Sequence, residues 1–253
     1  MEATDRRKYR SDDMVFKDGD FLEIEYSAWR AIDKKLLYTT IKEKAQEAGI
    51  YDEHENYGSA LVILGQNAVV KGLEKELKGM SVGESKKFEL KPEEAFGNRD
   101  ENLVRVMPVT EFRAQNINPV AGMTINIDGI PSTVKSVNSG RVVVDQNHPE
   151  AGMNILYEVK VLRLINNDKD KIDMLGKTYG AQPSKIDMKN DEIELYYDDK
   201  VKKNADYFVG RANLVASIFN YVGSANKVYI KEEYVKPKTA ESKTEKEGEK
   251  QQN

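Results

Sequence analysis

Short stretches in which apolar and polar residues alternate are the feature that most limits how this chain can fold. Within residues 21–28, Leu22, Ile24 and Tyr26 alternate with acidic residues and a serine. A period of two is typical of a β-strand with one buried face. Further apolar or alternating stretches lie at 61–64, 84–90, 123–127, 132–137, 141–145, 157–161, 192–197 and 227–235. A chain with this many short strands is predicted to be built on β-sheets.

Helical spacing of apolar residues marks two other stretches. The first predicts a short amphipathic helix over about 67–78. The second predicts a helix that begins after a cap at Asn204 or Asp206 and ends near Tyr221. Its buried stripe is predicted to contain Phe208, Ala212, Val215 and Phe219. Strands and helices together predict an α+β fold class.

The composition changes along the chain. Residues 236–253 contain no Val, Ile, Leu or aromatic residue, and residues 1–13 are similarly polar, so both ends are predicted to be solvated. Residues 106–144 contain several short alternating or apolar stretches, and the turn sequence at 138–140 joins two of them. They are therefore predicted to form a small β unit. A polar stretch at 166–171 precedes a third unit of α+β type.

Charge and the rarest residues exclude several classes of protein. Lys and Arg number 39 against 43 Asp and Glu, which argues against binding nucleic acid through bulk positive charge. Cysteine is absent, so disulfides, thiol nucleophiles and cysteine-ligated metal centres are excluded. With two histidines, a histidine-rich metal site is not expected. No apolar run approaches the ~18 residues of a membrane span, so the expectation is a cytoplasmic protein with no membrane partner.

Isolated motifs do not indicate a cofactor or a catalytic triad. Gly176-Lys177-Thr178 resembles the end of a phosphate loop, but Lys171 stands where the earlier glycine belongs. His148 precedes a proline in a loop, without a nucleophile or metal-ligand spacing, and is interpreted as structural. We therefore expect no cofactor and no metal.

A set of motifs resembles the FKBP-type peptidyl-prolyl isomerases. The segments 65–74 and 78–84 are similar to a strand-to-helix junction of that family and to the turn after its helix, and 94–97 is similar to a loop of the family. Residues 100–103 and 147–152 resemble the bacterial SlyD proteins and the long-type archaeal members, in which a small β domain is inserted near the substrate cleft.

The resemblance implies an antiparallel sheet wrapped on a short helix, with an inserted β domain and a C-terminal α+β domain. The implied parts are an N-terminal extension (1–13), an isomerase domain (14–105 and 145–166), an inserted chaperone domain (106–144), a C-terminal domain (167–235) and a charged tail (236–253).

The activity implied by the resemblance is rotation about X–Pro bonds, which is slow without a catalyst and needs neither a nucleophile nor a metal. The catalytic positions carried over are Tyr26, Leu37, Tyr38, Val69, Val70, Leu73, Phe96 and Tyr157, with Ala60 and Glu150 as substrate-binding positions. Helical spacing alone would interpret Val69, Val70 and Leu73 as ordinary core residues.

Several of these positions depart from the family pattern. Leu37 stands in place of a phenylalanine, Tyr38 in place of an aspartate, and Phe96 in place of a tyrosine. Ala60 is smaller than usual, and Glu150 replaces an apolar residue. The alternative to an active isomerase is therefore a chaperone with weak or no catalysis, whose altered pocket only binds peptide.

The expected partners are unfolded or nascent polypeptides that contain X–Pro bonds. In the insert, the residues predicted to contact such clients are Met107, Phe112, Met123, Ile125, Ile127 and Val142, although the same residues would also suit the core of that small domain. The aromatic residues of the helix at 204–222 predict a homodimer formed through residues 167–235.

Overall fold

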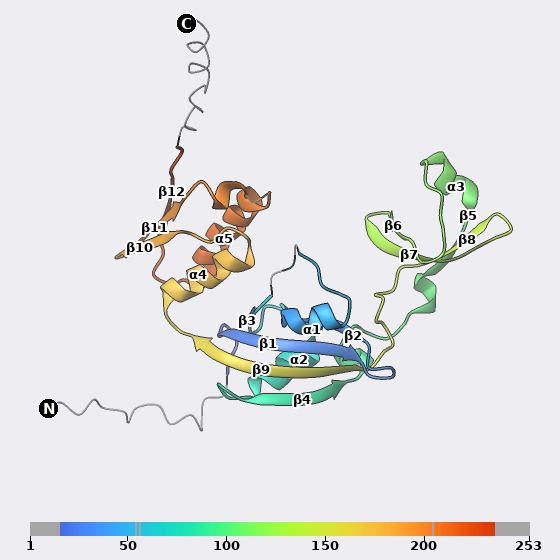
Figure 1. Cartoon of the computed structure of the whole chain (residues 1–253), viewed down its shortest axis with the longest axis horizontal. Helices are drawn as coiled ribbons and strands as arrows, with labels where there is room; N and C mark the ends of the chain where they lie inside the picture. Colours follow the sequence, from blue (N-terminus) through green and yellow to red (C-terminus); the bar gives the residue numbers. More distant parts are fainter. Residues whose placement is uncertain (1–15, 54, 56, 204, 236–253) are drawn as a thin grey trace, which may run out of the picture. The chain divides into compact units, whose positions relative to one another are not determined.

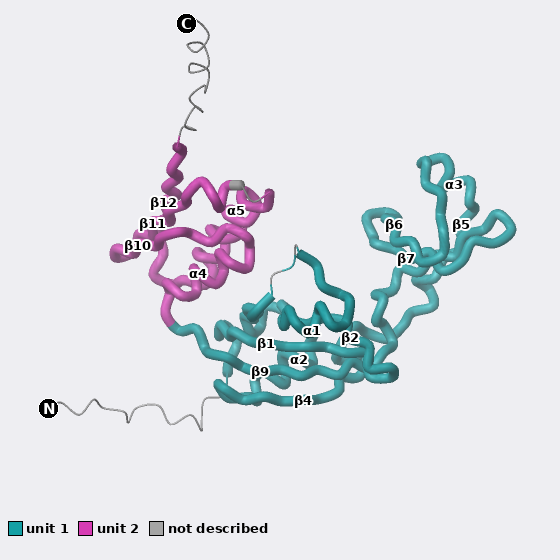
Figure 2. Tube along the Cα trace, in the orientation of Figure 1, with its two compact units in different colours: residues 1–166 teal, residues 167–253 magenta. Residues whose placement is uncertain are grey.

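The computed structural model of the chain describes residues 16–53, 55, 57–203 and 205–235. The expectations for residues 1–13 and 236–253, and for a cap at Asn204, lie outside the described residues. The chain divides into two compact units between Asn166 and Asn167, which Figure 2 shows in teal and magenta. The α+β fold class predicted from the sequence is confirmed. Each unit is described by itself below.

A five-stranded antiparallel sheet forms the base of the first unit. Its strands are β1 (Phe21–Arg30), β2 (Leu36–Thr39), β3 (Ala60–Ile63), β4 (Ser85–Leu90) and β9 (Ile155–Ile165). They lie in the order β2-β1-β9-β4, and β3 pairs with the first half of β1 on the same edge as β2. Strand β9 arrives from late in the chain and pairs with β1 along its whole length (Figure 1).

Helix α2 (Lys71–Lys78) packs against this sheet. Leu73 and Leu77 belong to one buried cluster with Ile24 of β1 and Val159 of β9. The helix begins later than predicted because Val70 has an extended backbone, with φ −60° and ψ 147°. Gly72 lets the helix approach Pro92–Glu94 closely, since a Cβ there would lie 2.9 Å from the Glu94 carbonyl oxygen. The other short elements are α1 (Lys42–Glu47) and two 3₁₀ turns, at Pro92–Glu94 and Glu101–Leu103.

The insert forms its own four-stranded antiparallel sheet. Its elements are β5 (Val104–Pro108), α3 (Val109–Ala114), β6 (Thr124–Ile127), β7 (Ile130–Asn138) and β8 (Arg141–Asp145), and its strands lie in the order β5-β8-β7-β6. The turn between β7 and β8 has positive φ at Ser139 (49°) and Gly140 (77°), as a two-residue hairpin requires.

The second unit is a small α+β fold. Its elements are α4 (Asp168–Thr178), β10 (Lys185–Lys189), β11 (Glu192–Tyr197), a 3₁₀ turn (Val201–Lys203), α5 (Tyr207–Tyr221) and β12 (Lys227–Glu232). Strand β10 runs antiparallel to β11, whereas β12 runs parallel to it after the crossover through α5. Parallel neighbours need such a crossover, which explains the helix between them.

The predicted buried stripe of α5 is wrong. Phe208 is 59% exposed and Phe219 is 50% exposed. The buried residues of the helix are Tyr207, Gly210, Leu214, Ser217 and Ile218. A Cβ on Gly210 would lie 1.9 Å from the Tyr179 carbonyl oxygen, so only glycine fits at this contact with the end of α4. This contact sets which face of α5 is buried. Asp206 occupies the cap position, but its side chain makes no capping hydrogen bond.

Candidate active site

Three aromatic rings lie together on the sheet of the first unit. Tyr157 of β9 is directly opposite Phe88 of β4, and their rings are stacked with centroids 5.9 Å apart. The ring of Tyr26, on β1, lies 6.3 Å from that of Tyr157. Burial raises the pKa of both tyrosines, and the charge of Glu55 adds to the effect at Tyr26. Both phenols therefore stay neutral over the physiological range.

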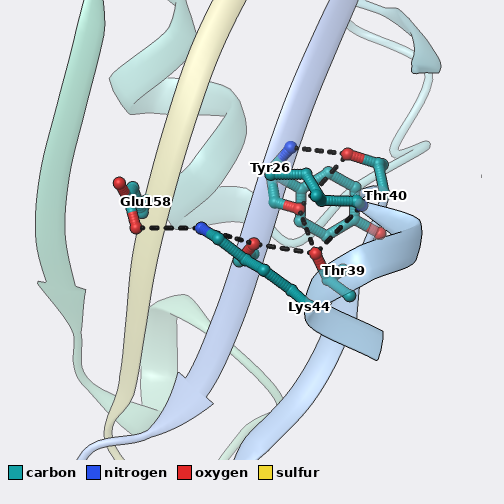
Figure 3. Close-up of polar contacts among 7 residues, drawn as sticks. Tyr26, Thr39, Thr40, Lys44 and Glu158 are labelled. Atoms are coloured by element: carbon teal, nitrogen blue, oxygen red, sulfur yellow. Dashed lines mark hydrogen bonds and ion pairs between the residues drawn. The ribbon is translucent and has the colours of Figure 1, made fainter. Parts of the chain in front are cut away.

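A polar network fixes β2 and α1 to β1 beside Tyr26 (Figure 3). The Tyr26 backbone N–H donates to Thr40 Oγ1 at 3.0 Å, and Thr39 Oγ1 donates to the Tyr26 carbonyl at 3.3 Å. Lys44 of α1 reaches across to Glu158 of β9 at 3.4 Å. These contacts hold Leu37 and Tyr38, which immediately precede the two threonines. The sequence analysis did not single out this threonine pair.

The predicted positions around Tyr26 pack against one core. Leu73 and Tyr157 are buried members of that core, with exposed fractions of 2% and 4%. The other residues are partly buried and pack against it: Tyr26, Leu37, Ala60, Val69, Val70 and Phe96, joined by Phe88 and Met153, which sequence reasoning missed. Leu73 and Tyr157 therefore lie inside this core, whereas the partly buried residues lie at its boundary.

Tyr38, Phe96, His148 and Glu150 form a second group at the edge of this site. The Phe96 ring stacks on the His148 ring, with centroids 4.2 Å apart and an interplanar angle of 4°, and Tyr38 lies 6.1 Å from Phe96. The Tyr38 hydroxyl donates to Glu150 Oε2 at 3.5 Å, and His148 Nδ1 lies 3.3 Å from the same oxygen. Burial and the charge of Glu150 raise the pKa of Tyr38. His148 thus adjoins the site, which its loop sequence did not indicate.

A buried polar junction joins the insert to the rest of the first unit. Asp145, at the end of β8, is 2% exposed and pairs with Arg99 at 2.7 Å and Lys135 at 3.5 Å. Asn147 binds both the backbone N–H and the carbonyl of Asp100, each at 2.8 Å. Burial alone would raise the pKa of Asp145, but hydrogen bonds from Asn147 and the charge of Arg99 outweigh it and lower the pKa to about 2.

The predicted client residues of the insert separate into two groups. Phe112, Ile125, Ile127 and Val142 are buried and form the core of the insert with Val134 and Val144. Met107 is partly buried against that core, whereas Met123 is 37% exposed. Direct contact between a client and the four buried residues would require the insert to open. Other apolar side chains are exposed on the insert but were not predicted: Val106 (62%), Val120 (56%) and Ile130 (46%).

A hollow of about 380 Å³ lies at the β1–β2 turn, where Arg30, Ile32, Glu89, Met153 and Asn154 line it. Met153 also packs against the core below the aromatic rings, so the hollow adjoins that core. Over residues 16–53, 55, 57–203 and 205–235, no three His, Asp or Glu side chains gather as metal ligands would. Within the same ranges, no helix has the length and apolar character needed to cross a membrane.

Comparisons with known proteins agree with this arrangement. The sequence model described as FKBP-type peptidyl-prolyl cis-trans isomerase matches residues 13–111, and the one described as FKBP26, IF domain matches residues 105–150. The short-type peptidyl-prolyl cis-trans isomerase of Methanocaldococcus jannaschii is 33% identical over 147 residues, which are 58% of this chain and 92% of that protein. SlyD of Pasteurella multocida is 32% identical over 136 residues, which are 52% of this chain and 68% of that protein. The chain therefore belongs to the FKBP-type peptidyl-prolyl cis-trans isomerases and carries an inserted domain of the FKBP26 type.

Proposed function

We propose that X–Pro bonds are isomerised at the surface formed by Tyr26, Val69, Val70 and Phe96, which pack on a core that includes the buried Tyr157, and that the insert holds unfolded polypeptide nearby. The observation that supports the site is the convergence of aromatic and aliphatic side chains from β1, β9 and the segment before α2 on one core. Neither a nucleophile nor a metal is required, because the barrier comes from amide resonance.

The polarity of the surroundings changes the barrier to rotation of the X–Pro amide. The planar amide is more polar than the twisted one, because rotation about the C–N bond removes the resonance that separates charge. An apolar surface that excludes water raises the free energy of the planar form relative to the twisted form. The neutral phenol of Tyr26 adds aromatic surface without adding charge, and the buried phenol of Tyr157 is neutral as well.

Cis-trans exchange of a short Ala-Leu-Pro-Phe peptide, measured by NMR with the full chain, tests this site. The natural protein is expected to accelerate exchange, and Tyr26→Ala is expected to lower the acceleration at least ten-fold. Tyr51→Ala is the matched control, because Tyr51 is 41% exposed and stacks on Tyr57 outside the site. Equal losses in both variants would contradict the proposed position of the site.

The alternative function is a chaperone that binds peptide with little catalysis. The observation that favours it is the Tyr38–Glu150 contact, because a charged group occupies the edge of an otherwise apolar surface. The same NMR measurement decides between the two functions. Peptide shifts without faster exchange would indicate binding only.

Client binding is assigned to the exposed apolar side chains of the insert. Val106 of β5 lies opposite Val143 of β8, so the two share one face of the insert sheet. Val106 and Ile130 are 62% and 46% exposed. The double variant Val106→Ser, Ile130→Ser should suppress aggregation of a refolding protein less well than the natural chain. Replacing the exposed Val82 of the isomerase part (42% exposed) by serine is the control and should leave suppression unchanged.

Homodimer formation is assigned to α5 of the second unit. Phe208, Val209 and Phe219 are 59%, 67% and 50% exposed on a single helix, and exposed apolar side chains gathered in one region mark protein–protein contact sites. A second copy of the same helix would cover these side chains symmetrically. Sedimentation equilibrium should show a dimer that the double variant Phe208→Ser, Phe219→Ser converts to a monomer. A natural chain that sediments as a monomer at high concentration would contradict this.

A further inference from the structure

Two acidic side chains are buried among the described residues, and both lie on the segment that returns from the insert. Asp145 is 2% exposed and is balanced by Arg99 and Lys135. Glu150 is 9% exposed, yet within the described part of the chain no lysine or arginine forms an ion pair with it. The two carboxylates are five residues apart but differ in their charge balance.

The neighbours of Glu150 place its charge at the edge of the candidate active site. Its Oε2 atom lies 3.5 Å from the Tyr38 hydroxyl and 3.3 Å from His148 Nδ1. Tyr38 is 40% exposed, and the His148 side chain is 42% exposed. Phe96 contacts both of these rings and also packs against the core of the site. A peptide that rests on Phe96 and Tyr38 therefore lies next to a partly desolvated carboxylate.

An acidic group in such a position discriminates between charged ligands. Burial removes much of the water that would screen the charge, so its attraction for a cation and its repulsion of an anion are stronger than at an exposed surface. The same carboxylate would leave uncharged ligands largely unaffected. It therefore favours one sign of charge partly by rejecting the other.

We propose that Glu150 selects peptides that carry lysine or arginine next to the proline and rejects peptides with an acidic residue there. This inference rests on the proposed function, because it requires the proline to bind at the surface that includes Phe96. The geometry makes Glu150 a specificity-determining residue, whereas the apolar surface serves all substrates alike.

The test compares three peptides that differ only in the residue before proline, Ala-Xaa-Pro-Phe with Xaa as Lys, Leu or Glu. A second series varies the residue after proline in the same way. With the natural full-length chain at pH 7.5, kcat/KM from NMR exchange should be about ten-fold higher for Lys than for Glu in at least one series. The Glu150→Gln variant should bring this ratio close to one, because glutamine keeps an acceptor for Tyr38 but removes the charge.

Two further variants separate charge from other effects. Glu76→Gln removes an acidic charge from α2, where Glu76 pairs with Lys86 at 2.5 Å, and should leave the Lys-to-Glu ratio unchanged. Tyr38→Phe removes the hydroxyl but keeps the carboxylate, so the ratio should persist even if the absolute rates change.

The leucine peptide distinguishes failure of this inference from failure of the proposed function. If the leucine peptide is isomerised but neither series shows a Lys-to-Glu preference, the inference on Glu150 is overturned and the function stands. A preference that survives Glu150→Gln overturns it equally. If the Tyr26→Ala variant still isomerises the leucine peptide at the natural rate, the site itself is misplaced.

Discussion

The isomerase sheet and the insert use their apolar residues in different ways. In the isomerase sheet, Tyr26, Val69, Val70 and Phe96 remain partly exposed around a core that Leu73 and other residues fill. In the insert, Phe112, Ile125, Ile127 and Val142 are themselves the core. A small β unit has few apolar residues and must bury most of them to fold. The larger sheet, with α2 packed on it, has enough apolar residues to leave some of them at its surface.

The largest effect is expected from a charge in the core of the insert. Val142 is fully buried, so Val142→Asp places an unpaired carboxylate among apolar side chains and should cost more than about 3 kcal/mol. We expect the insert to unfold while the isomerase sheet stays folded, as NMR amide signals of the two parts will show. Val120→Asp, at a position that is 56% exposed, is the control. Loss of the amide signals of both parts would show that the insert is not a separate folding unit.

A cavity in the isomerase core should have the next largest effect. Leu73→Ala removes a side chain that is 2% exposed and should lower the free energy of unfolding by about 2–4 kcal/mol. Urea unfolding followed by the fluorescence of Trp29, the single tryptophan, measures this change in β1. The insert amides should keep their protection from hydrogen exchange, which would show that the core of the insert is independent of the core of the isomerase sheet. A change below about 0.5 kcal/mol would mean that Leu73 is not a core residue.

Acid should weaken the polar junction that contains Asp145, between the insert and the rest of the first unit. The pKa of Asp145 is about 2 in the folded chain against an ordinary 3.8, so protonation favours the unfolded state. The stabilisation from Asp145 is therefore complete above about pH 4 and is lost as the pH falls toward 2, by roughly 2 kcal/mol. NMR-detected urea unfolding of the insert between pH 5 and pH 2 measures it.

The Asp145→Asn variant supplies the control for this acid dependence. It should be less stable than the natural chain at neutral pH, because it cannot form the ion pair with Arg99. Between pH 4 and pH 2 it should lose about 2 kcal/mol less than the natural chain does. Parallel pH profiles for the two proteins would contradict the role of Asp145.

The smallest effect is expected where an apolar residue of the insert is already exposed. Met123 is 37% exposed, so Met123→Ser should change the stability of the insert by less than about 0.5 kcal/mol. Ile125, two residues further on, is 7% exposed, and Ile125→Ser should cost roughly 2 kcal/mol or more. Hydrogen exchange of the insert amides measures both. Equal losses would remove the distinction between Met123 as a surface residue and Ile125 as a core residue.

Alternation along the strands could be read without the structure because it depends on neighbouring residues alone. Strands β1, β8 and β9 lie where their alternating or apolar stretches predict them. Helix α4 was missed because its first turn is polar, although Asn167 caps it by accepting a hydrogen bond from the Asp170 N–H. The buried face of α5 was misassigned because the contact between Gly210 and Tyr179 is invisible in a periodic pattern.

By itself the sequence determined the α+β class and the family and indicated the candidate site residues, because strand periodicity and short motifs are local properties. Only the tertiary structure decided which apolar residues of the insert are core, and that Tyr38, His148 and Glu150 lie together. Tyr38 and Glu150 are separated by 112 residues, and their meeting depends on how β2 and the segment before β9 are placed. The burial and the charge balance of a side chain depend on contacts between residues far apart in the sequence. A pattern of neighbouring residues therefore cannot predict them.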